Sequence, residues 1–243
     1  MWAFPSVAAA VAFVFAALLL RQFLGRRRSY QVLWALALFM YAVASLAVAI
    51  GALNGWGRFG FQAYWLLGAV LNVPFLAAGE LQLLIRNRTV DLVLDVILVF
   101  VVAYAISVVR GAVSDPQALT QQLPSGKQVF GDGSAAHRLP QLISIPSYLI
   151  LVGGTLWSAR RMRGRPELKD RFVGTLLIAL GATVIAGFGS AFAALGELPL
   201  FSVSLLAGIA VMFWGFLRAS RSAASVPAAP SPSRTPSGTS SAS

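Results

Sequence analysis

The sequence predicts an all-α polytopic membrane protein, with seven transmembrane helices in a bundle, the N-terminus outside and the C-terminus in the cytoplasm. Three observations lead to this fold class: the scarcity of charged residues, seven long apolar stretches, and the placement of the basic residues. Only 11% of the 243 residues are charged and 58% are hydrophobic, whereas a soluble domain carries about 25% charged residues. A surface in contact with lipid requires apolar side chains, so the lipid bilayer is the expected partner.

Each apolar stretch is long enough to cross the hydrocarbon core, which requires about 20 residues of helix. The predicted spans, within a transmembrane domain of residues 1–218, occupy residues 4–24, 32–53, 64–85, 90–109, 139–158, 172–195 and 198–217. Residues 111–138 form the one long loop, which is predicted to be extracytoplasmic and to hold a small hairpin or a lid. Residues 219–243 are rich in Ser, Ala and Pro, which predicts a disordered cytoplasmic tail.

The basic residues determine the expected orientation. Residues 160–171 contain six Lys or Arg between two apolar runs, and a short basic loop of this kind stays in the cytoplasm. With that loop inside, fifteen basic residues are cytoplasmic and only four, Arg58, Arg110, Lys127 and Arg138, are outside. Because the first apolar stretch is followed rather than preceded by basic residues, we expect an uncleaved first span. The expected localisation is the plasma membrane, and Arg outnumbering Lys 17 to 2 is typical of a GC-rich bacterial genome.

Glycine and proline predict how the spans pack. Lipid gives helices no hydrophobic reason to associate, so small residues that allow close backbone approach mark the interfaces. The sixth span is rich in glycine and contains the pair Gly187 and Ala191, which predicts a central position in the bundle. Pro74 and Pro146 lie inside the third and fifth spans, where each removes a backbone hydrogen bond and is expected to kink its helix.

Two acidic residues are the strongest candidates for a functional site. Glu80 lies six residues before Arg86, and Asp95 lies six residues after Thr89. At about 1.5 Å per residue, both carboxyl groups lie roughly 9 Å inside the cytoplasmic boundary, on consecutive antiparallel helices. Intramembrane acids are costly and commonly functional.

Two interpretations of this acidic pair are open. Facing each other, the carboxylates would share a proton or hold a cation, because two close carboxylates do not both stay ionised cheaply. Alternatively, each pairs with an arginine of the cytoplasmic rim, and Arg21 is the expected counter-ion. Asn72 and Gln82 make the third span the most polar, and they either line a cavity or make an interhelical hydrogen bond.

The sequence lacks the residues that several classes of chemistry require. The chain has no Cys and one His, which excludes disulfides, thiolate nucleophiles and multi-histidine metal sites. A microbial rhodopsin needs a Schiff-base Lys in its last span, and none lies there. Ser–His pairs, zinc motifs and the Gly-x-Gly-Asp motif of intramembrane proteases are also missing. We therefore expect no enzymatic activity, no cofactor and no metal. The basic residues flank the spans, so nucleic acid is not an expected partner.

The chain resembles bacterial seven-span membrane proteins of no known activity. The shared features are the basic loop after the fifth span, the glycine-rich sixth span, and the ending Met212-Phe213-Trp214-Gly215-Phe216-Leu217. The resemblance implies the fold but no activity. The leading expectation is a membrane module that responds to a small molecule or an ion, with a pocket among spans three, four and six beneath the long loop. The alternatives are a secondary transporter or proton-coupled carrier that uses Glu80 and Asp95, and a structural partner within a homo- or hetero-oligomer.

Overall fold

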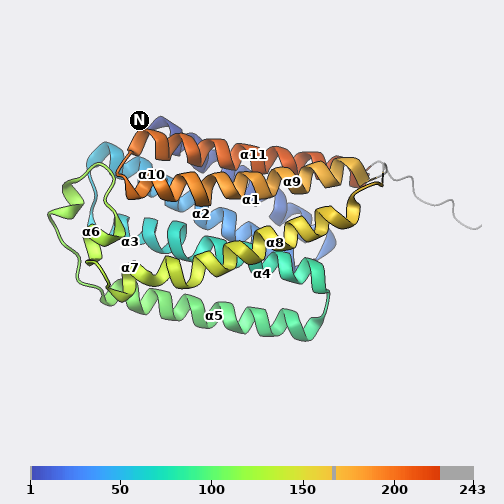
Figure 1. Cartoon of the computed structure of the whole chain (residues 1–243), viewed down its shortest axis with the longest axis horizontal. Helices are drawn as coiled ribbons and strands as arrows, with labels where there is room; N and C mark the ends of the chain where they lie inside the picture. The colour runs from blue at the N-terminus through green and yellow to red at the C-terminus, as the bar shows by residue number, and fades with distance from the viewer. Residues whose placement is uncertain (1, 166–167, 225–243) are drawn as a thin grey trace, which may run out of the picture.

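The computed structural model describes residues 2–165 and 168–224, without the side chains of Arg26 and residues 221–224. No strand occurs in that part of the chain, and seven helical stretches are long and apolar enough to cross a membrane (Figure 1). The helices are α1 (Ala3–Arg26), α2 (Ser29–Asn54), α3 (Arg58–Ala63), α4 (Asn72–Ile85), α5 (Arg88–Gly111), α6 (Gly126–Phe130), α7 (Ala135–Leu139), α8 (Ile145–Met162), α9 (Lys169–Thr183), α10 (Ser190–Ala194) and α11 (Leu198–Ala224). The chain is therefore an integral membrane protein, as its composition predicts.

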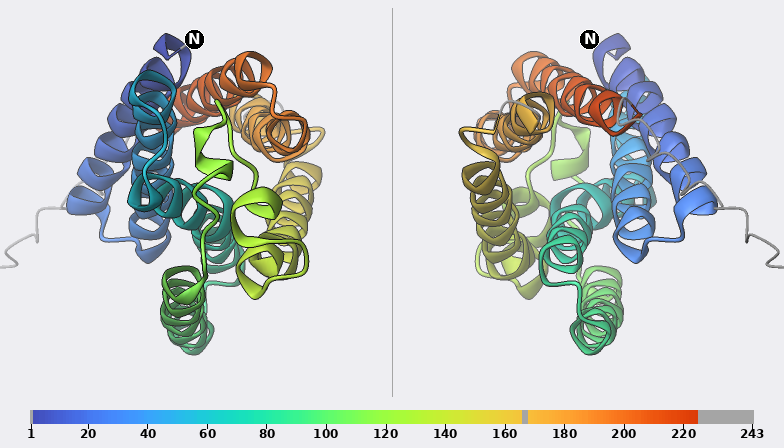
Figure 2. Two further views of the ribbon diagram at one scale, coloured as in Figure 1. Left: turned by 90° about the vertical axis from the view of Figure 1, so that its left-hand side faces the viewer. Right: turned by 90° about the vertical axis from the view of Figure 1, so that its right-hand side faces the viewer.

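Six of the spans form a closed ring. Helix α1 contacts α2, α2 contacts α4, α4 contacts α8, α8 contacts α9, α9 contacts α11, and α11 closes on α1 (Figure 2). Helix α5 lies outside this ring and packs on one side against α4 and the segment before it. The seven spans are thus not equivalent, because α5 is not a member of the ring and contacts it from one side.

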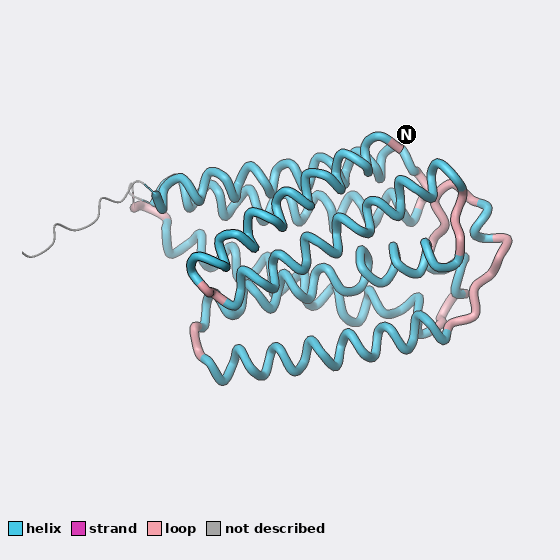
Figure 3. The backbone as a smooth tube through the Cα atoms, turned by 180° about the vertical axis from the view of Figure 1, so that it is seen from behind, coloured by secondary structure: helices cyan, strands magenta, loops and turns pink. Residues whose placement is uncertain are grey.

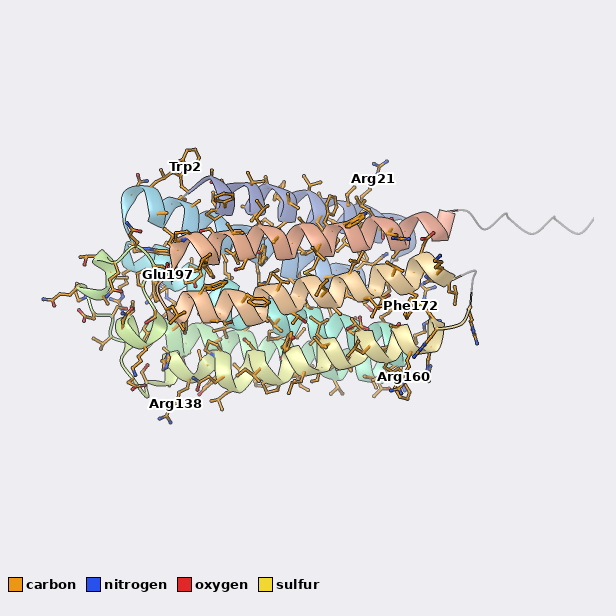
Figure 4. The ribbon with its side chains drawn as sticks, turned by 45° about the horizontal axis from the view of Figure 1, so that its top comes forward. Trp2, Arg21, Arg138, Arg160, Phe172 and Glu197 are labelled. Carbon is orange, nitrogen blue, oxygen red and sulfur yellow. The ribbon has the colours of Figure 1, made fainter. Side chains whose placement is uncertain are left out.

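The two ends of the bundle differ in chemistry. One end, here called the lid end, carries the first turn of α1, the α2–α3 turn and the long connection between α5 and α8, as Figure 3 shows. The opposite end, here called the basic end, carries the turns after α1, α4 and α8. Arg21 and Arg160 lie toward the basic end and Arg138 at the lid end (Figure 4).

Three spans contain a π-helical segment, and two of these segments precede a proline. Residues Tyr64–Leu71 are π-helical just before Pro74, and residues Pro140–Ser144 are π-helical just before Pro146. Proline has no N–H and its ring displaces the carbonyl of the preceding turn, and a wider turn accommodates both effects. The expected irregularity at each proline is therefore present as a local change of helix type. The third π-helical segment, Val184–Gly189, has glycines instead of a proline.

Glycines join α9 and α11 at two levels. A β-carbon on Gly174 would lie 2.5 Å from the carbonyl oxygen of Gly215, and one on Gly181 would lie 2.5 Å from the carbonyl oxygen of Gly208. Gly174 and Gly181 are seven residues apart on α9, as Gly208 and Gly215 are on α11. The two backbones therefore stay in close contact over two turns of helix. This is the small-residue packing that the sequence predicts for the sixth span.

The pair Gly187 and Ala191 does not take part in this packing. Both residues are exposed, and no atom lies within 4 Å of a β-carbon placed on Gly187. The expectation that this pair forms an interface, and that the sixth span is central, is therefore wrong: the span is one member of the ring and turns this face outward. Small residues alone do not distinguish a helix-facing from a lipid-facing surface.

The boundaries of the last span also differ from the prediction. Helix α11 continues to Ala224, so the first six residues of the predicted tail, 219–224, are helical. Alanine and arginine are strong helix formers, so the helix continues past the apolar run. Arg218 donates a 3.0 Å hydrogen bond to Asp170 at the start of α9 and links the two helices there. Residues 225–243, where the rest of the tail was expected, lie outside the described residues.

Candidate functional site

Glu80 is buried at the interface between α4 and α8. Only 2% of its surface is exposed. A β-carbon on Gly154 of α8 would lie 2.8 Å from Glu80 Cγ and 3.4 Å from Glu80 Oε1, so the absence of a side chain at Gly154 makes room for the carboxyl group. Among the residues that the structure describes, no hydrogen bond or ion pair reaches this carboxyl group. A buried charge without a partner is costly, so Glu80 remains a candidate for a functional residue.

Asp95 lies in a different environment. Its side chain is exposed on α5, and its Oδ1 accepts a 3.0 Å hydrogen bond from Nε2 of Gln82 on α4. Gln82 itself is only 4% exposed, and its own Oε1 is buried without a described partner. This is the interhelical amide hydrogen bond that the sequence allowed for Gln82, and it ties α5 to the ring.

The two carboxyl groups are therefore not a pair. No hydrogen bond joins Glu80 to Asp95: Glu80 packs against α8, whereas Asp95, on α5, accepts its hydrogen bond from Gln82. Residues two positions apart on an α-helix point about 200° apart, so Glu80 and its neighbour Gln82 leave α4 on opposite sides. The matched depth predicted for the two acids does not bring them together, and the shared-proton interpretation is not supported by this geometry.

The expected counter-ion is also elsewhere. Arg21 is exposed on α1 and points away from the bundle, as Figure 4 shows. Helix α1 neighbours α2 and α11 in the ring, whereas Glu80 lies on α4 and Asp95 on α5. The ion pairs found among described residues join Lys127 to Asp132 and Arg218 to Asp170. Arg21 does not neutralise either candidate acid, because sequence proximity to the rim does not place two side chains on facing helices.

Asn72 is buried with 6% of its surface exposed, at the first residue of α4. It lies two residues before Pro74, where the π-helical segment ends. Two turns of helix separate it from Glu80, so the structure does not unite Asn72, Glu80 and Gln82 in one cavity.

The connection between α5 and α8 folds into a lid over one end of the ring. Helices α6 and α7 lie across the ring opening in Figure 2. Phe130 of α6 packs its ring 5.5 Å from that of Phe61 and 6.0 Å from that of Trp65. The indole N–H of Trp65 donates a 2.9 Å hydrogen bond to the carbonyl oxygen of Ala136, and that of Trp56 donates one to the carbonyl oxygen of Gln122. The lid that the sequence allowed for this loop is thus present and docked.

A groove lies at the basic end, between the α1–α2 turn and α5. Its volume is about 770 Å³, and Phe75 of α4 contributes to its lining. Arg27, Ser29 and Asp95 are its polar residues, and all its other lining residues are apolar. The pocket expected among spans three, four and six is not found among the described residues, because α5 and α9 are not neighbours: α8 and α11 flank α9, and α5 lies outside the ring (Figure 2).

Two interhelical hydrogen bonds, one buried and one partly buried, were not predicted from the sequence. The hydroxyl group of Tyr41 on α2 donates a 2.9 Å hydrogen bond to the carbonyl oxygen of Leu205 on α11, and Tyr148 on α8 donates one to the hydroxyl of Thr183 on α9. The position of these tyrosines in the middle of predicted spans could have indicated such bonds, because a buried tyrosine hydroxyl usually finds a hydrogen-bond partner.

These features define an integral membrane protein with a lidded ring of six spans, one peripheral span and, at the contact of α4 with α8, a buried glutamate for which the described residues offer no hydrogen-bond partner. No protein-family model, curated protein or solved structure matches the chain.

Proposed function

We propose that the protein is an ion-responsive membrane module in which Glu80 is the responsive group and the α4–α8 contact is the element that responds. The observation that carries this proposal is the burial of Glu80 against Gly154, without a described hydrogen-bond or ionic partner. An intramembrane acid in such a place marks a functional site by default.

The chemistry follows from the cost of a buried charge. With a proton bound, the Glu80 carboxyl group is neutral, and a neutral group is compatible with the place that Glu80 occupies against Gly154. Loss of that proton places a charge at the helix interface, which favours either entry of a small cation or separation of α4 from α8. Proton or cation binding at Glu80 thus controls how closely the two helices pack.

The proposal does not include a carrier based on two acids. Such a carrier would hold its ion between Glu80 and Asp95, but Glu80 lies against α8, and Asp95 lies on α5 and is hydrogen-bonded to Gln82. A response of the α4–α8 contact needs only the one carboxyl group.

Infrared spectroscopy of the protein in lipid, recorded across pH, tests the protonation step. We expect a carboxylic C=O band at neutral pH in the wild type and its loss in Glu80→Gln. Matched controls are Asp95→Asn and Glu197→Gln, each of which removes an exposed acid and should leave the band intact. Superimposable wild-type and Glu80→Gln spectra at every pH would refute the proposal.

A distance measurement tests the response. Because the chain has no Cys, cysteines introduced at the exposed positions Ile85 on α4 and Leu156 on α8 carry two spin labels without further changes. The distance between the labels should change with pH in the wild-type background and stay constant in the Glu80→Gln background. A distance that does not change with pH in either background would show that Glu80 does not control the α4–α8 contact.

The orientation of the module is part of the same proposal. The basic end is proposed to face the cytoplasm and the lid end the outside, in a plasma membrane, because the basic residues gather at the basic end. A reporter that works only in the cytoplasm should be active when fused after Ser243 and inactive when inserted near Lys127. The reverse result would invert the topology.

A further inference from the structure

The groove between the α1–α2 turn and α5, here called the α5 groove, has its polar groups at one end. Arg27, Ser29 and Asp95 lie toward the basic end, whereas the α5 side chains that continue the groove from Leu98 to Ile106 are apolar. From Asp95 to Ile106 the helix advances about 16 Å. The groove is therefore long and apolar, with Arg27, Ser29 and Asp95 at one end, here called its head region.

The α5 groove opens sideways toward the lipid. Helix α5 lies outside the ring, and within its most apolar window only 17% of the residues are buried. Large side chains on its surface, such as Val99 and Phe100, are 68% and 72% exposed. The molecules that meet this surface in a membrane are lipids, so a lipid reaches the groove without crossing the protein.

Asp95 places a carboxyl group in the head region of the groove, and this group requires a cation beside it. Its carboxyl group accepts one hydrogen bond, from Gln82, and forms no ion pair with another described side chain. It lies seven residues from the start of α5, about 10 Å along the helix. A carboxylate at that depth, on a surface that faces lipid, is costly without a cation beside it.

Arg27 supplies the opposite charge on the other wall of the groove. It is exposed, has a left-handed backbone conformation with φ of 47°, and ends α1, with Ser29 starting α2 two residues later. No ion pair joins Arg27 to Asp95, although both line the groove. The head region thus offers one positive and one negative group, held apart on separate helices.

We propose that the α5 groove binds one phospholipid with a primary ammonium headgroup, of the phosphatidylethanolamine type. The ammonium group donates hydrogen bonds to Asp95, the phosphate lies against Arg27 and Ser29, and an acyl chain follows the apolar wall of α5. A trimethylated headgroup has no N–H to donate to Asp95, and a lipid with only an anionic headgroup leaves Asp95 without a cation. Phosphatidylethanolamine matches both charges and the apolar length.

Lipid titration of the full chain in detergent, followed by native mass spectrometry, tests the proposal. The probes are phosphatidylethanolamine, phosphatidylcholine and phosphatidylglycerol with identical acyl chains. We expect the ethanolamine lipid to bind the wild type about tenfold more tightly than the choline lipid, as for a charged hydrogen bond of about 1.5 kcal/mol. Asp95→Asn should abolish this preference.

Three further variants separate the groove from general charge effects. Asp91→Asn removes an acid one turn away on α5, outside the groove lining, and should keep the preference. Ala103→Trp fills the apolar part of the groove and should weaken binding of all three lipids. Arg27→Asn replaces the arginine with a residue that tolerates a positive φ. It should weaken binding of all three phospholipids, because each of them carries the phosphate that Arg27 is proposed to contact.

Two results would overturn the proposal. Equal binding of the ethanolamine and choline lipids to the wild type would show that Asp95 does not recognise an ammonium group. Tighter binding of phosphatidylglycerol than of phosphatidylethanolamine would show that arginines simply gather anionic lipids at the basic end. Both results concern the groove and leave the proposed role of Glu80 unaffected.

Discussion

The glycine contacts between α9 and α11 allow a quantitative test of how the ring is held together. In Gly181→Ala, the new β-carbon would lie 2.5 Å from the carbonyl oxygen of Gly208 and 2.8 Å from the backbone nitrogen of Met212. An ordinary contact begins at 3.4 Å, so the two backbones must separate by about 0.9 Å. The obstacle is backbone on the partner helix, so a change of side-chain conformation does not relieve it.

The expected magnitude combines two opposing terms. Overpacking of this kind costs about 1–3 kcal/mol, and replacing a helical glycine by alanine returns about 0.5–1 kcal/mol. Gly181→Ala should therefore lower the free energy of unfolding by about 0.5–2 kcal/mol. Gly187→Ala is the matched control on the same span: nothing lies within 4 Å of its β-carbon, so it should be neutral or raise stability by about 0.4–1 kcal/mol.

Reversible unfolding in mixed detergent micelles, followed by tryptophan fluorescence, measures both changes. The double variant Gly181→Ala/Gly208→Ala adds a further check, because two substitutions at one contact should be less damaging than the sum of the single effects. If Gly181→Ala is as stable as Gly187→Ala, close backbone approach does not hold α9 to α11.

Other parts of the molecule give further expected outcomes. Gln82→Leu removes the hydrogen bond to Asp95 and should lower the free energy of unfolding by about 0.6 kcal/mol, the average for an interhelical bond in a membrane; a loss of equal size in the Asp95→Leu background, which has no acceptor, would show that the two side chains are not coupled. A side chain at Gly126 meets the indole of Trp65, so Gly126→Ala should loosen the lid and speed its cleavage by added protease; an unchanged cleavage rate would contradict the docked lid. Lys127 lowers the pKa of Asp132 through a hydrogen bond and its charge, and Lys127→Met should raise that pKa toward the ordinary value in an NMR titration. An acid whose pKa is lowered in the folded state stabilises the fold at a pH above its unfolded-state pKa, and this stabilisation is lost as the pH falls through the folded-state pKa. Because Asp132 is fully exposed, solvent screens its interaction with Lys127. The wild type and Lys127→Met should therefore have the same free energy of unfolding at neutral pH, and a clear difference would contradict this.

The spans were predictable because the lipid restricts every residue that faces it. Their number and approximate limits follow from apolar length, and the separation of Arg138 from Arg160 at opposite ends follows from helix alternation. The order of the spans around the ring was not predictable, because lipid-facing and helix-facing residues are both apolar. The exposed Gly187 shows the difficulty: its sequence context resembles that of Gly181, yet only Gly181 meets a neighbouring helix.

The candidate residues were identifiable from the sequence, but the directions of their side chains were not. Glu80 and Asp95 stood out because acids are rare in spans, and counting residues predicted that they lie at similar depth. Counting did not indicate which neighbour each side chain faces, and Gly154, which makes room for Glu80, had no distinguishing signal. The lid had one: Ser125 and Gln128 have the spacing of a capping box, which the structure forms at α6.

The closed ring has a consequence for how the protein is made. Contact between α1 and α11 joins the earliest of the seven spans to be synthesised with the latest of them. Until Leu198 and the residues after it enter the membrane, the inward faces of α1 and α9 have no protein neighbour at the gap, and buried residues such as Phe15 remain open to lipid. A chain that stops before its final span therefore presents an unfinished surface throughout its lifetime, which membrane quality control is able to recognise. Helix α5, which lies outside the ring, imposes no such requirement on the order of assembly.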